Sequence, residues 1–471
     1  MDELNFLSAR QMADQIRQKK ISPVELIQAH LSRIKRLNSR LNAYIQVDED
    51  RVLREAQVSE AAIMRGEVAG PLHGVPLSIK NSVAVAGYAH EVGTRLRMGT
   101  VAALDAPLVS RLKRAGAIIL GVTNTPEMLM AWETDNLLYG RTNNPWDLSR
   151  TAGGSSGGEA AAIASGCSAA GVGSDGGGSI RVPAHFCGIC GLKPTPGRIP
   201  STGHYPPSAG PFALIGVVGP MARTVGDLQT LFEVMAGPDD GDPCAAPVPL
   251  RPISREQLQQ TRIAYFEDDG RTPVTRETRA AVHSAVEKLE GAGFTVGPFR
   301  PDDLELARQL WWQWFGVAGG MLLGRDAEGR EGELSPIFKE YLGWAGAGPR
   351  HTGDTLLDSW ILRDQLRSKI LAQMEVFPIL LCPAAAIPAF HHGERSWRIE
   401  ESTVRYLDAW SYTEWFNLLG FPGAVVPSGK SGEGLPIGVQ LVGRPWEEEL
   451  VLAVAAEVER KGPGFQPPPI S

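Results

Sequence analysis

The segment GSDGGGSIRVPA, residues 173–184, is the stretch from which the rest of the chain can be interpreted. Three consecutive glycines precede Ser179, and glycines allow successive backbone N–H groups to converge on one point beside the serine hydroxyl. Donors arranged in this way stabilise an oxyanion during acyl transfer. We therefore expect Gly176, Gly177, Gly178 and Ser179 to form an oxyanion hole with a candidate nucleophile, although a glycine- and serine-rich run is more often an ordinary loop.

Two charged residues flank this turn. Asp175 precedes the glycines and Arg181 follows Ser179 at a distance of two residues. We expect the pair to form a structural ion pair that ties the glycine turn down, and we prefer this interpretation to a direct contact with substrate.

A lysine upstream supplies a candidate base. Apolar residues alternate along HGVPLSIK, residues 73–80, which predicts a strand that ends at Lys80. Burial disfavours an ammonium group, so a lysine at the end of an apolar strand tends to lose its proton, and the neutral amine is a competent general base. The alternative is a lysine that is paired at the surface.

Other motifs in the chain have weaker support. GGSSGG, residues 153–158, satisfies G-x-S-x-G at Ser155 and Ser156, but a polar loop precedes it where a nucleophile elbow needs a strand. GVGSDG at 171–176 is not followed by a helix start, as a dinucleotide site requires, and the S-x-x-K at 110–113 falls on the exposed face of a predicted helix. Cys187 and Cys190 lack the second half of a zinc site and are interpreted as buried apolar residues, so we expect no metal and no cofactor.

Helical and strand patterns alternate along the chain. Ser8 and Ser22 each precede an amphipathic segment and have a glutamine or glutamate three residues later, which predicts two capped helices. Residues 108–116 read as a helix that leads into the buried strand AIILGV. We predict an α/β fold in which one large mixed β-sheet is covered by helices on both faces.

The domain organisation follows from composition. Residues 1–70 are expected to form an N-terminal helical layer packed on the main domain, and residues 71–471 to form a single catalytic α/β domain. Residues 240–260 are rich in proline and aspartate and mark the start of a variable, substrate-side insert over about 240–400.

Composition excludes several classes of function. The chain has 471 residues, 43% of them hydrophobic and 21% charged, with a formal net charge of -7, which is ordinary for a globular protein and unfavourable for binding nucleic acid. The N-terminus has no signal-peptide pattern, and no apolar run is long enough to cross a bilayer. Five cysteines without a framework suggest a reducing compartment, so we expect a cytoplasmic protein that contacts neither nucleic acid nor membrane.

Taken together, these segments resemble the amidase signature family of serine hydrolases. The family pattern is a Gly-Gly-Ser-Ser-Gly-Gly turn followed by Gly-Gly-Ser-Ile-Arg, with an upstream lysine in a Gly-Val-Pro context, and the resemblance covers most of the chain. It implies that Ser179 is the acylating nucleophile, that Ser155 is a bridging serine held by a cis peptide, and that Lys80 is the base. Ser156 is expected to support that turn.

The substrate is less clearly indicated. The chain is similar to stand-alone bacterial amidases and to urethanases that cleave carbamates, so it is expected to act on small amides, esters or carbamates as a monomer or homodimer. The alternative is a glutamyl-tRNA amidotransferase subunit that needs partner chains, but the segment after Arg198 differs from that subgroup. We expect a loop from Arg198 through Tyr205 and Phe212, with Met130 and Ala131, to shape the substrate pocket.

A tryptophan-rich helix adds a further candidate surface. Two interpretations stay open for these aromatic side chains: a hydrophobic channel for an acyl or aryl group, or ordinary core packing. The residues concerned are Trp311, Trp312, Trp314 and Phe315, with Trp410 and Trp415 later in the chain.

Overall fold

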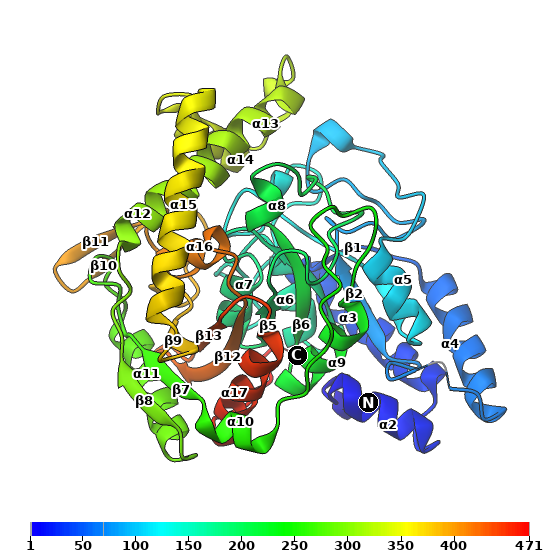
Figure 1. The fold of residues 1–471 in the computed structure, drawn as a ribbon. Helices are drawn as coiled ribbons and strands as arrows, with labels where there is room; N and C mark the ends of the chain where they lie inside the picture. The colour runs from blue at the N-terminus through cyan, green and yellow to red at the C-terminus, as the bar shows by residue number, and fades with distance from the viewer. Residues whose placement is uncertain (1, 69, 471) are drawn as a thin grey trace.

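One mixed β-sheet runs through the protein. In the computed structural model, which describes residues 2–68 and 70–470, the sheet has eleven strands (Figure 1). Their order is β1 (Tyr44–Val47), β3 (Ile118–Thr123), β2 (Pro76–Lys80), β4 (Ala170–Asp175), β6 (Val217–Ala222), β5 (Cys190–Lys193), β12 (Gly423–Lys430), β13 (Pro436–Gly443), β9 (Ile379–Pro383), β7 (Arg262–Tyr265) and β8 (Thr295–Pro298). A separate hairpin pairs β10 (Ser396–Ile399) with β11 (Ser402–Arg405).

The sheet mixes parallel and antiparallel pairs. Strand β2 is parallel to both β3 and β4, and β7 is parallel to both β8 and β9. The strands between these two groups, from β4 to β9, pair antiparallel. The predicted α/β fold with a large mixed sheet is therefore confirmed.

Helices cover both faces of the sheet. The helices of the first half are α1 (Asp2–Asn5), α2 (Ala9–Arg17), α3 (Pro23–Leu41), α4 (Glu49–Met64), α5 (Pro107–Arg114), α6 (Gly157–Ala164), α7 (Arg181–Cys187), α8 (Phe212–Ile215) and α9 (Val225–Met235). Those of the second half are α10 (Arg255–Gln260), α11 (Arg276–Glu290), α12 (Leu304–Trp311), α13 (Gly319–Ala327), α14 (Pro336–Gly346), α15 (Gly353–Gln373), α16 (Ser411–Leu418) and α17 (Glu448–Lys461). Short helical turns are η1 (Arg95–Arg97), η2 (Glu127–Leu129) and η4 (Glu331–Glu333), and η3 (Trp312–Ala318) is a π-helix.

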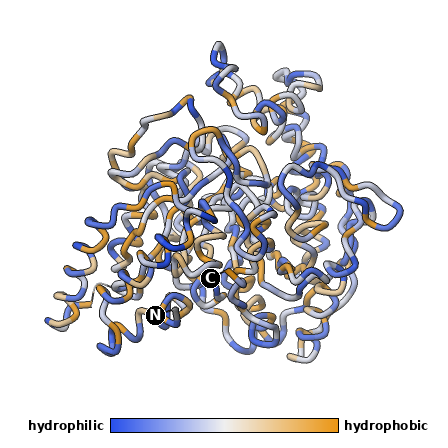
Figure 2. The backbone as a smooth tube through the Cα atoms, turned by 180° about the vertical axis from the view of Figure 1, so that it is seen from behind, coloured by the Kyte–Doolittle hydropathy of each residue, from blue (hydrophilic) through white to orange (hydrophobic). Residues whose placement is uncertain are grey.

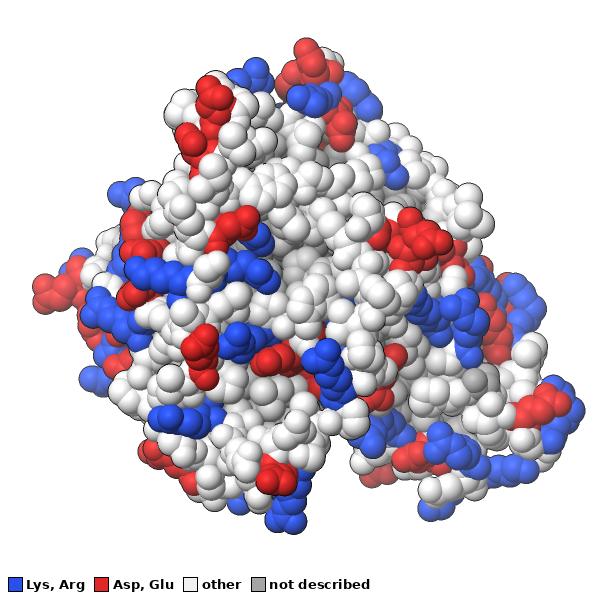
Figure 3. All heavy atoms as spheres, in the orientation of Figure 1, with Lys and Arg blue, Asp and Glu red and all other residues white. Residues whose placement is uncertain are grey.

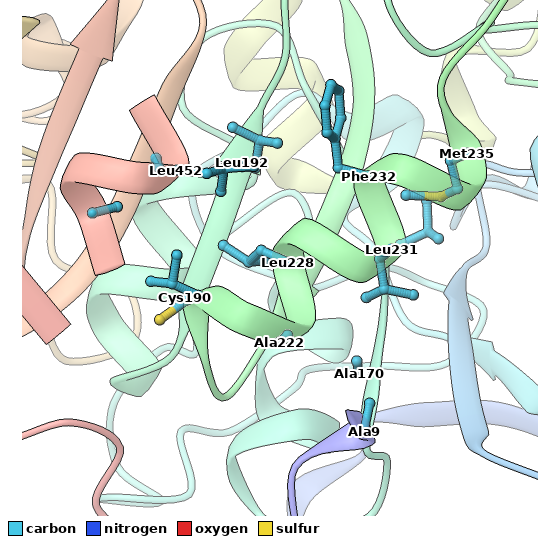
Figure 4. Packing of buried hydrophobic residues seen from close by; sticks show 14 of the residues in the cluster. Ala9, Ala170, Cys190, Leu192, Ala222, Leu228, Leu231, Phe232, Met235 and Leu452 are labelled. Atoms are coloured by element: carbon cyan, nitrogen blue, oxygen red, sulfur yellow. The ribbon is translucent and has the colours of Figure 1, made fainter. Parts of the chain in front are cut away.

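Alternation along β2 decides which side chains reach the candidate site. Leu77 and Ile79 point into the core that β2 shares with α2, α5 and α9. Figure 4 shows part of this core, where α9 packs against β5 and the sheet. Because successive strand residues point to opposite faces, Ser78 and Lys80 lie on the other face, where α6 packs against the sheet.

The N-terminal region departs from the expected helical layer. The capping boxes at Ser8 and Ser22 are present and begin α2 and α3, as predicted. However, Tyr44–Val47 forms β1, which pairs with β3 at the edge of the sheet, so residues 1–70 are not helical throughout. The strand has only four residues between two long helices, which is too short for its periodicity to be recognised. The division into two domains stays a prediction.

The surface carries no large region of one charge on the face shown in Figure 3, where acidic and basic side chains are interspersed. Seen from behind, hydrophilic and hydrophobic residues alternate along the outlying helices (Figure 2), as expected for helices with one buried side. Within residues 2–68 and 70–470, no helix combines the length and apolar character that a membrane span requires.

Candidate active site

Lys80 ends β2 inside the protein, with no part of its side chain exposed. Its Nζ lies 2.6 Å from Ser155 Oγ, 2.9 Å from Ser156 Oγ and 2.9 Å from Ser174 Oγ. Burial lowers the pKa of Lys80 well below the usual value for a lysine, although Asp175 acts in the opposite direction. The amine is therefore neutral over a range of pH in which a surface lysine is charged, and it has a lone pair to offer to a serine hydroxyl.

A buried carboxyl group lies behind this lysine. Glu159, on α6, is hydrogen-bonded by the hydroxyl groups of Ser78 and Thr123, the latter at 2.8 Å. Burial raises the pKa of Glu159 to about 8, against the opposing effect of these hydrogen bonds and of Lys80. Burial thus disfavours the charged form of both groups, the ammonium of Lys80 and the carboxylate of Glu159, and so disfavours a buried ion pair.

The GGSSGG turn brings its two serines to Lys80. The Gly154–Ser155 peptide bond is cis, and α6 begins directly after Ser156. A side chain at Gly154 would come within 2.6 Å of the backbone of Glu133, so the close approach requires glycine. Ser156 donates to the carbonyl of Ser174 at 3.2 Å, which connects the turn to β4.

Two tryptophan side chains donate hydrogen bonds to the glycine turn at residues 176–178, which follows β4. Trp311 Nε1 donates to the carbonyl of Gly176, and Trp132 Nε1 donates to that of Gly177, both at 2.9 Å. Since the N–H and C=O of a trans peptide point in opposite directions, these bonds also orient the N–H groups that follow. Among the described residues, the N–H groups of Gly176, Gly177 and Ser179 have no hydrogen-bond acceptor.

The expected oxyanion hole needs one correction at Gly178. Its N–H donates to Asp175 Oδ1 at 2.7 Å and is therefore not free to bind an oxyanion. Gly178 has φ of +111°, and a side chain there would come within 2.5 Å of Thr413. Its role in this geometry is to let the chain turn, and the donors available to a ligand are those of Gly176, Gly177 and Ser179.

The predicted ion pair between Asp175 and Arg181 is confirmed. Both side chains are completely buried, and two guanidinium nitrogens lie 3.0 and 3.1 Å from the carboxylate. The carboxylate also accepts the N–H of Ile180 at 3.0 Å and the side-chain amide of Asn417 at 3.0 Å. Burial opposes ionisation, but Arg181 holds the pKa of Asp175 well below its usual range. The pair thus fixes both ends of the glycine turn.

Two pockets meet at Ser179. The first, here called the inner pocket, contains Ser155 and Gly176, and the second, here called the aromatic pocket, contains five aromatic side chains. The inner pocket is lined by Leu129, Met130, Ser155, Ser174, Asp175, Gly176, Ser179, His204, Pro206, Pro207, Ser208, Phe212, Gly216, Val217 and Phe315. The aromatic pocket is lined by Leu129, Met130, Ala131, Trp132, Gly177, Ser179, Trp312, Phe315, Tyr341, Trp344 and Leu407.

Two of the residues predicted to bind substrate line the pockets, and a third lies elsewhere. Met130 and Ala131 line the pockets, but Arg198 does not. The Arg198 side chain is buried elsewhere, where it pairs with Glu448 and Glu449 of α17 and stacks on Phe232. Its interpretation as a substrate-binding residue is therefore wrong, because a buried guanidinium group takes the nearest carboxylates as partners.

Some residues of the predicted aromatic cluster line a pocket and the others pack in the core, so both interpretations of the cluster apply in part. Trp312 and Phe315 line the aromatic pocket, and both belong to the π-helix η3. The others are buried in the aromatic core around α12 and α16, namely Trp311, Trp314, Trp410 and Trp415. A π-helix has more residues per turn than an α-helix and is frequent at functional sites.

Several residues of the site were not predicted from the sequence. Ser174 and Glu159 contact the lysine or its strand, and Trp132 orients the glycine turn. The signal was present only for Ser174, which lies within the quoted glycine-rich segment. Cys187 and Cys190 are buried free thiols.

Comparison with known proteins identifies the family of this chain. A sequence model of the family described as Amidase matches residues 25–452. This chain belongs to the amidase family. It is 34% identical to an acylamidase from Rhodococcus erythropolis, over 98% of this chain and 96% of that protein. It is also 32% identical to a glutamyl-tRNA(Gln) amidotransferase subunit from Moorella thermoacetica, over 97% of each.

Solved structures of the amidase family share the fold. One, a bacterial aryl acylamidase of the amidase signature enzymes, superimposes with a TM-score of 0.86 at 26% identity, over 98% of this chain and 97% of that one. The resemblance noted in the GGSSGG and GGSIR segments therefore extends to the whole architecture, and the identification as an amidase-family enzyme is confirmed.

Proposed function

We propose that this amidase-family chain hydrolyses amide bonds through an acyl-enzyme on Ser179, with Ser155 as a proton bridge and Lys80 as the base. The observation that carries the proposal is the buried Lys80 amine, which lies 2.6 Å from Ser155 Oγ, and Ser155 in turn shares the inner pocket with Ser179. A lysine with a lowered pKa replaces the histidine of other serine hydrolases as proton acceptor.

The proposed reaction uses the same groups in both directions. Neutral Lys80 accepts the hydroxyl proton of Ser155, and Ser155 accepts that of Ser179 as the Ser179 oxygen bonds to the carbonyl carbon. When the C–N bond breaks, Ser155 returns a proton to the leaving nitrogen, so an amine departs rather than an amide anion. Water then loses a proton along the same route and attacks the acyl-enzyme, which releases the acid and the free Ser179 hydroxyl.

The carbonyl oxygen would be stabilised by backbone N–H groups. Those of Gly176, Gly177 and Ser179 have no acceptor among the described residues, and the carbonyls preceding two of them are held by Trp311 and Asn417. Donors that are already oriented do not need to reorganise as charge develops on the oxygen, which is the condition for effective stabilisation.

The substrate class that we propose is aryl amides together with aryl carbamates. The support is the set of aromatic side chains on both sides of Ser179. Phe212 and Phe315 line the inner pocket, where an aryl leaving group would meet Ser155, and Trp132, Trp312 and Trp344 line the aromatic pocket on the acyl side. Rings of this kind bind flat aryl groups through stacked and edge-on contacts. The acylamidase and aryl acylamidase relatives are consistent with an aryl amide, whereas carbamate hydrolysis is our own extension of the argument.

The purified chain provides the test. We expect it to hydrolyse an anilide without any partner, and Ser179→Ala to lose both turnover and covalent labelling by a fluorophosphonate. Labelling that moves to Ser155 in this variant would contradict the assignment of the nucleophile. If the enzyme cleaves small anilides but not an aryl carbamate of similar size, the carbamate part of the proposal is wrong.

An amidotransferase component is the second candidate, because the Moorella thermoacetica relative is matched over nearly its whole length. Such a component would pass ammonia to partner chains instead of working alone. Anilide hydrolysis by the isolated chain at a rate lost in Ser179→Ala favours the amidase, and absence of any such activity favours the amidotransferase component.

A further inference from the structure

His204 lines both the inner pocket and a wider neighbouring cavity of about 600 Å³. Its loop is attached to the segment that directly follows Lys80. His204 forms an antiparallel bridge with Val83, Tyr205 donates its N–H to the Ser82 carbonyl at 2.8 Å, and Ala84 donates to the Gly203 carbonyl at 3.0 Å. The imidazole thereby lines the inner pocket together with Ser155 and Ser179.

The hydrogen bonds of His204 identify its tautomer. Nδ1 lies 2.8 Å from the carbonyl oxygen of Pro206, and a carbonyl oxygen can only accept, so Nδ1 carries the proton. Burial lowers the pKa of His204 to about 3; the Pro206 hydrogen bond opposes this shift, and the neighbouring Lys80 and His90 add to it. The ring is therefore neutral, and Nε2 has a free lone pair.

This Nε2 atom is buried and has no partner among the residues that the structure describes. A buried acceptor left unpaired is unfavourable, so a group that enters the inner pocket with a donor gains the missing hydrogen bond. The inner pocket also contains Ser155, which in the proposed reaction protonates the leaving nitrogen, whereas the aromatic pocket does not contain it. The side of the scissile bond that faces His204 is therefore the leaving-group side.

We propose that Nε2 of His204 accepts a hydrogen bond from an N–H group of the leaving group, and so makes the enzyme select substrates with an N–H at the scissile bond. Primary and secondary amides carry such a donor, and N-substituted tertiary amides and esters do not. The inference rests on the proposed function, because it uses Ser155 to distinguish the two sides of the scissile bond.

Two substitutions separate this contact from the structural role of the loop. His204→Asn keeps a side-chain N–H that can bond to the Pro206 carbonyl, but it has no acceptor at the position of Nε2. His204→Gln places an amide oxygen near that position and serves as the matched variant. Both substitutions leave Lys80, Ser155 and Ser179 in place.

The assay compares three substrates with one acyl group: a secondary 4-nitroanilide, its N-methyl derivative and the 4-nitrophenyl ester. In His204→Asn we expect kcat/KM to fall about tenfold for the secondary anilide and less than about twofold for the other two. His204→Gln is expected to recover most of the loss. For each substrate, kcat/KM of the variant is divided by that of the wild type, so intrinsic differences in reactivity between the substrates cancel.

Each outcome decides between defined alternatives. Equal losses on anilide and ester in His204→Asn, or no loss on either, would overturn the proposed contact. A wild-type enzyme that hydrolyses none of the three substrates, or a Ser179→Ala variant that still hydrolyses them, would overturn the proposed function instead. Fluorophosphonate labelling of both His204 variants at the wild-type rate shows that the site is correctly folded.

Discussion

Replacing Gly177 by alanine is expected to disable the oxyanion hole while leaving the fold intact. The added Cβ would lie 2.4 Å from the Trp311 ring, and an ordinary contact begins at 3.4 Å. The glycine turn or the ring must therefore move by about 1 Å. The ring cannot easily move, because Trp311 is buried and stacks on Phe315 with centroids 4.7 Å apart.

The expected shift of the glycine turn moves the backbone N–H groups that would bind the oxyanion. The Gly177 N–H follows the carbonyl that Trp311 holds, so a shift of about 1 Å misplaces a donor relative to the substrate carbonyl. Misplacements of this size cost on the order of 100-fold in rate, and the loss of one oxyanion donor costs about 100- to 1,000-fold. We expect kcat/KM for an anilide to fall by about 100-fold or more, with a decrease of about 1–3 kcal/mol in the free energy of unfolding from overpacking.

The assay is steady-state hydrolysis of a chromogenic anilide, with urea unfolding as the measure of stability. Gly353→Ala is the matched control, because a Cβ at Gly353 at the start of α15 meets nothing within 4 Å. This control is expected to keep wild-type activity. A Gly177→Ala enzyme with kcat/KM within about threefold of wild type would refute the reasoning, since the turn would then tolerate the displacement.

Three further substitutions test other parts of the site. Activity on amides should rise with pH through the lowered pKa of Lys80, because only the neutral amine accepts a proton, and a rise centred near pH 10.4, the ordinary lysine value, would contradict the argument. In Lys80→Ala, kcat/KM should fall about 100-fold or more for an anilide. It should fall much less for an activated ester, because the leaving group of the ester needs no proton. Arg181→Met should leave the buried Asp175 carboxylate uncompensated and lower the free energy of unfolding by about 3–5 kcal/mol. Because the pKa of Asp175 is lowered in the folded state, ionised Asp175 stabilises the wild-type protein above its unfolded-state pKa of about 3.9, and this stabilisation is lost as the pH falls. Urea unfolding of Arg181→Met between pH 7 and pH 3 should therefore lack the pH-dependent stabilisation that the wild type shows. Arg198→Met should reduce stability in the same assay but leave fluorophosphonate labelling of Ser179 unchanged, because the Arg198 side chain lies outside both pockets; slower labelling would contradict that placement.

Local sequence patterns were sufficient for much of this protein. The alternation before Lys80 predicted a strand that ends at this lysine, and the structure has that strand at Pro76–Lys80. The capping pattern at Ser22 likewise placed the start of α3. Such features depend on residues that are near neighbours in the chain, so the sequence alone contains the physical information needed to predict them.

The contacts of the glycine turn could not be predicted in this way. Gly178 looks like its neighbours in sequence, and only the position of Asp175 shows that its N–H is already engaged. Trp132 and Thr413, which hold the Gly177 carbonyl, lie 45 and 236 residues away in the chain.

Arg198 and His204 also show that the sequence does not reveal which side chains line the pocket. Both lie in the loop after the glycine-rich segment, and the sequence argument chose Arg198 for the pocket because it begins that loop. The structure gives Arg198 two carboxylate partners on α17, whereas His204 lines the inner pocket with Ser155 and Ser179 and its Nε2 atom has no partner among the described residues. The sequence determined which residue types were available for chemistry. The tertiary structure decided which of them remain unpaired in the pocket, because hydrogen-bond partners are assigned by distances between segments that are remote in the chain.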